Sequence, residues 1–243
     1  MQGPGFAAEE AGWLQRMVNV FNAPQSSFAA VLGRESALDW LLPVAVTCLV
    51  GLGCHYLTID TVSSLDAPAV QEKLINMSEQ ERAQYEQSVQ MLRAQGWTMV
   101  PVGHFSSLVF VGAIMLIVAR LVFHSEMTFR QSLIVKGYAT LVISMEWVVR
   151  ALMVLATDSP FVFMGPGMFV GDEATATFLG RVLMNINFFD LWQLWIMGIG
   201  LSMLGSIDRQ RAQWTLAALW VMWLFGGAGL EILGAQAGLS AVE

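Results

Sequence analysis

The sequence has few charged residues and only two cysteines, and each shortage excludes a class of protein. Charged residues make up 13% of the 243 residues, whereas soluble domains carry roughly 25%. The formal net charge of -7 excludes a broad electrostatic footprint for nucleic acid. Cys48 and Cys54 lie in one apolar stretch and on different faces of a helix, so we expect small packing residues and no mutual disulfide.

The sequence also lacks the spacing patterns that assemble a reaction centre. His55, His104 and His124 are dispersed and form no HExxH motif. There is no Gly-x-Ser-x-Gly elbow and no glycine-rich phosphate loop that ends in Gly-Lys-Ser or Gly-Lys-Thr. Two cysteines offer too few soft ligands for a metal site. We therefore expect a protein that is not an enzyme and that holds no cofactor and no metal.

Five long apolar stretches, separated by polar segments, dominate the sequence. Hydrophobic residues amount to 56%, and the mean hydropathy is +0.58. Crossing a bilayer takes roughly 20 apolar residues in helical form, and only a helix or a closed barrel satisfies its backbone polar groups in lipid. We predict an all-α polytopic membrane protein with a bundle of five transmembrane helices, near Trp40–Leu57, Gly103–Phe123, Leu133–Ala156, Val182–Leu204 and Trp214–Leu233.

Residues 1–37 are predicted to form an N-terminal interfacial segment, ahead of a transmembrane domain at residues 38–243. An amphipathic helix in this segment would place Gln15, Arg16 and Asn19 opposite its apolar face. The alternative is an ordinary helix that packs against the bundle. The apolar face, which is expected to anchor in the membrane surface, consists of Trp13, Leu14, Met17, Val18 and Phe21.

The one sizeable polar segment between apolar stretches covers residues 60–97. Ser78 followed by Glu81 predicts a capping box, and Gly96 is typical of a helix end. Its acidic residues are interpreted as a solvated face, with a partner-docking surface as the alternative. We predict an extramembrane helical hairpin with helices at about Ala69–Asn76 and Glu79–Gln95.

The distribution of basic residues predicts an orientation. With the N-terminus cytoplasmic and the C-terminus outside, seven basic residues fall on the inner side and five on the outer side. The inner set is Arg16, Arg34, Arg120, Arg130, Lys136, Arg209 and Arg211, and the outer set is Lys73, Arg82, Arg93, Arg150 and Arg181.

Polar residues inside the third and fourth apolar stretches are the candidate functional groups. A charge at mid-span costs about 2.5–3.5 kcal/mol on insertion scales and normally faces the bundle interior. Glu146 and Arg150 are four residues apart, which favours a helical ion pair, and we expect Arg150 or Lys136 to neutralise Asp190. These groups are predicted to join helices, with a proton or ion path as the alternative. The predicted polar network consists of Lys136, Glu146, Arg150, Asn187, Asp190 and Gln193.

Small residues on the fourth helix predict a close helix–helix contact. Gly198, Ser202 and Ser206 recur every four residues, and such a small-residue ladder lets another helix approach.

Several segments of the sequence form a recognisable pattern. They are Val20-Phe21-Asn22-Ala23-Pro24 with Phe28, Met77-Ser78-Glu79-Gln80, Phe129-Arg130-Gln131-Ser132-Leu133 with Tyr138, Asn187-Phe188-Phe189-Asp190-Leu191-Trp192, and Gly198-Ile199-Gly200-Leu201-Ser202. With these segments the chain resembles the Yip1 domain family of five-span membrane proteins, in particular its bacterial members, from about Met17 to Gly229. The resemblance implies a non-enzymatic membrane protein; eukaryotic relatives bind prenylated Rab GTPases, and some bacterial relatives are encoded with ABC-type export systems. The family offers no catalytic residues.

The sequence is compatible with three functions. The first is a scaffold or accessory subunit in a bacterial inner membrane that binds another integral membrane protein or forms a homo-oligomer, and an ABC-type export system is one candidate partner. The second is a small transporter or channel that uses the intramembrane charges. The third is a protein that binds lipid or shapes the bilayer.

Overall fold

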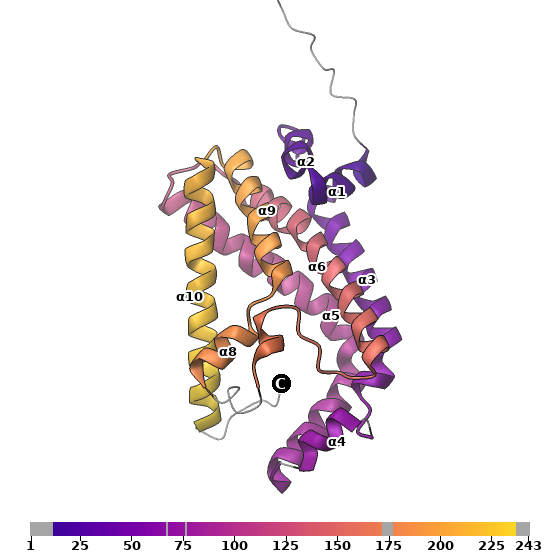
Figure 1. Cartoon of the computed structure of the whole chain (residues 1–243). Helices are drawn as coiled ribbons and strands as arrows, with labels where there is room; N and C mark the ends of the chain where they lie inside the picture. The colour runs from indigo at the N-terminus through magenta and orange to yellow at the C-terminus, as the bar shows by residue number, and fades with distance from the viewer. Residues whose placement is uncertain (1–11, 67, 76, 172–176, 237–243) are drawn as a thin grey trace, which may run out of the picture. The chain divides into compact units, whose positions relative to one another are not determined.

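The computed structural model describes residues 12–66, 68–75, 77–171 and 177–236, and this part of the chain is all-helical (Figure 1). Helical residues make up 82% of the described residues, and no strand occurs among them. The predicted all-α class is therefore confirmed. Residues 1–11 of the predicted N-terminal segment, and Asn76 at the end of the first predicted hairpin helix, lie outside the described residues.

Among the described residues, four helices are long and apolar enough to cross a membrane, and the number is five if one bent pair of helices is counted as a single span. The four are α3 (Leu38–Val62), α5 (Glu79–Leu121), α6 (Phe129–Thr157) and α10 (Arg209–Gln236). The fourth expected span, Val182–Leu204, is not one straight helix. It is divided into α8 (Phe178–Met184) and α9 (Phe188–Leu204), which are bent by 67°.

Two asparagines explain the break between α8 and α9. The side-chain amide of Asn185 donates to the carbonyl oxygen of Arg181 at 3.1 Å, and Asn187 Oδ1 accepts from the Phe189 amide at 3.0 Å. Asparagine side chains that bond nearby backbone groups compete with the helical ladder. The 3₁₀ helix η1 (Pro166–Phe169) precedes this region.

The polar segment between α3 and α5 contains the helix α4 (Pro68–Ile75), which overlaps the predicted helix at Ala69–Asn76. The predicted capping box forms, because Ser78 N donates to Glu81 Oε2 at 2.7 Å. That this segment is an extramembrane hairpin stays a prediction. The second predicted helix does not end near Gly96 but continues into the span as α5. Gly96 allows a close approach, because a Cβ there would clash with the His55 ring.

The chain forms two compact units. Among the described residues, the first consists of residues 12–47, 104–143 and 192–217, and the second of residues within 48–103, 144–191 and 218–236. Several helices contribute residues to both units.

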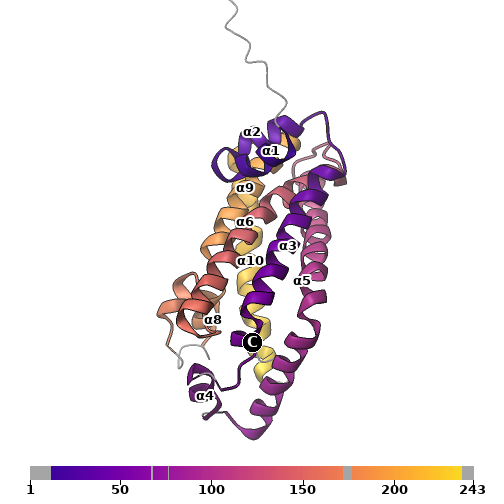
Figure 2. The same ribbon diagram turned by 90° about the vertical axis from the view of Figure 1, so that its right-hand side faces the viewer.

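In the first unit, α1 (Trp13–Asn22) and α2 (Pro24–Val31) lie against each other beside the N-terminal end of α3 (Figure 2). Phe28 is fully buried and packs edge-on against the ring of Tyr138 at 5.9 Å between centroids. Gly200 makes room for both Phe28 and Val135, since a Cβ at Gly200 would lie within 2.7 Å of each side chain. The helix α2 is thus part of the core.

Two apolar clusters are found among the described residues of the second unit. One consists of Val70, Leu74 and Tyr85, which brings α4 against the first half of α5. The other consists of Val182, Leu224 and Ala228, which brings α8 against α10. Cys48 and Cys54 are buried free thiols.

Candidate functional site

The predicted polar network divides between the two units. In the first unit, Lys136 of α6 is only 6% exposed. Its ammonium group donates to Gln193 Oε1 of α9 at 3.1 Å, and Gln193 Nε2 donates to the carbonyl oxygen of Ala139 at 3.2 Å. Gln193 therefore accepts from one residue of α6 and donates to another, which joins the two helices.

The hydroxyl groups of two threonines extend this contact to α3. Thr140 Oγ1 donates to the carbonyl oxygen of Lys136 at 2.8 Å, and Thr47 Oγ1 of α3 lies 3.3 Å from the carbonyl oxygen of Thr140. Both threonines are buried. These hydrogen bonds therefore join α3, α6 and α9 within the first unit.

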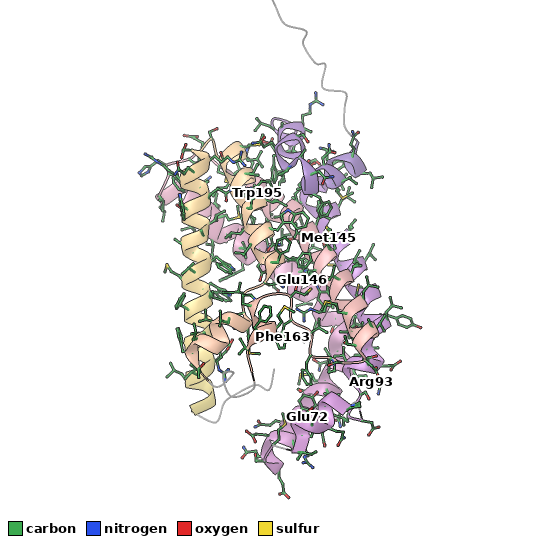
Figure 3. The ribbon with its side chains drawn as sticks, in the orientation of Figure 1. Glu72, Arg93, Met145, Glu146, Phe163 and Trp195 are labelled. Carbon is green, nitrogen blue, oxygen red and sulfur yellow. The ribbon has the colours of Figure 1, made fainter. Side chains whose placement is uncertain are left out.

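In the second unit, Glu146, which is labelled in Figure 3, connects two other residues of the predicted polar network. The carboxylate accepts from Asn187 Nδ2 at 2.7 Å and from the Arg150 guanidinium at 3.4 Å. The Arg150 side chain is 44% exposed and that of Glu146 is 14% exposed, so the ion pair itself contributes little. Arg150 also donates to the carbonyl oxygen of Val162 at 3.3 Å. The predicted ion pair of Glu146 and Arg150 is confirmed.

Asp190 lies in the first turn of α9 and is half-buried. A carboxylate in this position is favourable because the helix dipole places partial positive charge there. That Arg150 or Lys136 neutralises Asp190 stays a prediction. Among the described residues, no group of three or more histidine, cysteine, aspartate or glutamate side chains is placed to hold a metal ion.

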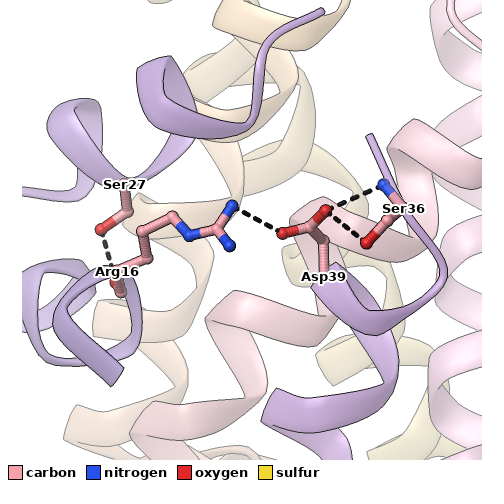
Figure 4. Close-up of polar contacts among 4 residues, drawn as sticks. All are labelled: Arg16, Ser27, Ser36 and Asp39. Atoms are coloured by element: carbon pink, nitrogen blue, oxygen red, sulfur yellow. Dashed lines mark hydrogen bonds and ion pairs between the residues drawn. The ribbon is translucent and has the colours of Figure 1, made fainter. Parts of the chain in front are cut away.

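Sequence reasoning missed a buried ion pair, which joins Arg16 of α1 to Asp39 of α3 (Figure 4). Arg16 NH1 lies 2.9 Å from Asp39 Oδ1, and the two side chains are 11% and 1% exposed. Ser36 donates to Asp39 Oδ2 through its backbone amide at 2.8 Å and its hydroxyl at 3.0 Å. Ser27 Oγ donates to the carbonyl oxygen of Arg16 at 2.7 Å.

This ion pair corrects the predicted orientation of α1. Arg16 was expected on the polar face but is buried, because it reaches Asp39 and lies over the Trp13 ring at 4.1 Å from the centroid. Phe21 contacts Trp192 edge-on at 6.0 Å between ring centroids. Leu14 and Val18 remain 72% and 52% exposed. The helix therefore packs against the first unit and also presents an apolar edge.

A second contact attaches the segment before α3 to α6. Gln131 Nε2 donates to Glu35 Oε1 at 2.9 Å. This hydrogen bond, helped by backbone amides and the charge of Arg130, lowers the pKa of Glu35 below its ordinary value.

The predicted small-residue ladder is partly wrong. Gly198 does face another helix closely, because a Cβ there would meet the side chain of Gln213 from α10 at 2.5 Å. Ser202 lies on α9, and its hydroxyl donates to the carbonyl oxygen of Ile207 at 2.8 Å. Ser206 lies beyond the end of α9 with a positive φ of 52°, because the chain turns there into α10.

Comparison with family models, curated proteins and solved structures gives no significant match. The resemblance to the Yip1 domain family stays a prediction.

Proposed function

We propose that this chain is a non-enzymatic membrane scaffold that binds another integral membrane protein through the face of α10. The supporting observation is how little of this helix the rest of the chain covers. In its most apolar 18-residue segment, 17% of the residues are buried, whereas the value is 39% in α3 and in α6. Trp223 is 73% exposed and Leu230 is 72% exposed.

Glycines beside Trp223 give this face a shape that a second helix fits. A Cβ built on Gly226, Gly227 or Gly229 would have no atom within 4 Å. Glycine inside a helix costs about 1 kcal/mol relative to alanine, and no close packing against the described residues offsets that cost here. Small residues in membrane helices let two backbones approach closely, so another membrane protein or a second copy of this chain fits this face.

The remaining features of the proposal follow from the sequence. The scaffold resides in a bacterial inner membrane with its N-terminus cytoplasmic and its C-terminus outside. The bent pair α8 and α9 counts as one of five spans, α1 lies at the interface, and α4 with the first part of α5 forms an extramembrane hairpin. An ABC-type export system is the partner that the family resemblance implies. The transporter alternative gains no support from Lys136, which is buried and bonded to Gln193.

Replacing Gly226 by leucine tests the proposed interface. The new side chain fills the space that a partner helix would occupy, so the stoichiometric partner should fall to trace amounts when the protein is extracted in mild detergent and weighed by native mass spectrometry. The free energy of unfolding should change by less than about 0.5 kcal/mol, as for other surface substitutions, because nothing lies within 4 Å of the added Cβ.

Gly53→Leu on α3 is the matched control. Gly53 is also exposed and has no atom within 4 Å of a built Cβ, so this variant should keep its partner. Retention of the partner by Gly226→Leu, or equal loss in both variants, contradicts the proposed interface.

A further inference from the structure

Five exposed arginines gather at helix ends of the first unit, and we call them the basic surface. Two contacts bring the turns that carry them together. Arg130 NH1 lies 3.4 Å from the carbonyl oxygen of Glu35, and Ser125 Oγ donates to the carbonyl oxygen of Gly205 at 2.6 Å. The basic surface consists of Arg34, Arg120, Arg130, Arg209 and Arg211.

Acidic side chains of the described first unit do not balance this surface. Asp39 is buried against Arg16, and Glu35 is half-buried and bonded to Gln131. Two acids are exposed, Glu126 and Asp208, and Asp208 Oδ1 accepts from the Arg211 backbone amide at 2.9 Å. Without counting Arg34, the four exposed arginines Arg120, Arg130, Arg209 and Arg211 face two exposed anions, which favours a negatively charged partner.

The position of the basic surface along the helices indicates which partner this is. The arginines lie at the C-terminal end of α5, at the N-terminal ends of α6 and α10, and just before α3. Where such helices cross a bilayer, their ends lie at the level of the lipid headgroups. Arginine binds phosphate groups through a planar fork of donors, and basic residues next to membrane spans attract anionic lipids.

A shallow groove on the same unit adds aromatic side chains to the basic surface. It is lined by Arg209, Gln210 and Asp208 together with two tryptophans, Trp195 of α9 (Figure 3) and Trp214 of α10. Trp195 is 42% exposed and Trp214 is 69% exposed. Tryptophan favours the bilayer interface because its ring is apolar while its N–H is polar.

We propose that the basic surface binds anionic phospholipids, with Arg209 at the headgroup phosphate and Trp195 and Trp214 beside the upper part of the acyl chains. The exposed edge of α1, formed by Leu14 and Val18, enters the same leaflet. Lipid binding is independent of the partner face on α10. It uses charged residues of the first unit, whereas the partner face is apolar and belongs to the second unit.

Native mass spectrometry of the delipidated full-length protein tests this proposal. Phosphatidylglycerol or phosphatidylcholine is added at equal concentration, and lipid adducts are counted. We expect more phosphatidylglycerol adducts, and fewer as the ionic strength rises. An arginine near an anionic surface contributes about fivefold to binding, so Arg209→Gln with Arg211→Gln should weaken phosphatidylglycerol binding by up to about 30-fold.

The matched control removes two arginines from the second unit. Arg82 and Arg93 are exposed, and Arg82→Gln with Arg93→Gln changes the net charge by the same amount. This variant should keep the preference for phosphatidylglycerol. Equal binding of the two lipids by the wild type, or equal loss in the two double variants, overturns the proposal. So does undiminished binding by Arg209→Gln with Arg211→Gln, the result expected if these arginines instead dock an acidic protein.

Discussion

Replacing Asp39 by alanine is expected to lower the free energy of unfolding by about 3–5 kcal/mol, the usual cost of removing one partner of a buried ion pair. The Arg16 side chain is 11% exposed, so its charge would lose its carboxylate without gaining water. The loss is measured by titrating the detergent-solubilised protein with sodium dodecyl sulfate. A limited trypsin digest gives a second readout, because release of α1 would expose the bond after Arg16.

A double variant separates the charge from the packing. Arg16→Met with Asp39→Leu removes both charges and keeps apolar bulk, so most of the lost stability should return. If Asp39→Ala unfolds no more easily than the wild type, or if Arg16 stays protected from trypsin in that variant, the ion pair does not hold α1 to the first unit.

Replacing Gln193 by leucine is expected to cost about 1.5–3 kcal/mol, the value of a hydrogen bond to a charged group. The buried ammonium of Lys136 would lose the oxygen that lies 3.1 Å away, and the Ala139 carbonyl would lose its contact with Gln193 Nε2. The same detergent titration measures the loss.

Adding Lys136→Met to Gln193→Leu should restore stability, because a buried polar pair can be replaced by apolar residues at little cost. This result separates a structural role for Lys136 from a role in transport. An ion flux into liposomes that the wild type supports and Lys136→Met abolishes would make the structural interpretation wrong.

Hydropathy predicted the helices that are long and apolar enough to cross a membrane, but it did not predict where they are interrupted. An apolar stretch of about 20 residues can be recognised from the sequence alone. The helices α3, α6 and α10 accordingly lie where they were expected. Averaging over such a stretch hides single polar residues, so the break between α8 and α9 was missed, although Asn185 and Asn187 carried the signal. Gly96 was interpreted as a helix end because its close contact with His55 depends on tertiary structure.

The sequence predicted which residues belong to the candidate site, but it did not predict which of them contact one another. Lys136, Gln193, Glu146 and Asn187 were chosen because polar groups in apolar stretches need partners, and spacing identified only the pair of Glu146 and Arg150. Arg16 and Asp39 are 23 residues apart, and helical periodicity alone assigned Arg16 to the polar face. The available signal was that Arg16 is the one charged residue of its amphipathic helix and that an aspartate stands at the start of α3.

Photo-cross-linking from position 223 tests the central claim that α10 presents an interface to another membrane protein. A photoreactive phenylalanine replaces Trp223 in one variant and Leu57 of α3 in another; both side chains are exposed, at 73% and 61%. Irradiation of intact membranes should give a discrete protein adduct from position 223 and none from position 57. Adducts with lipid alone at both positions would contradict the claim.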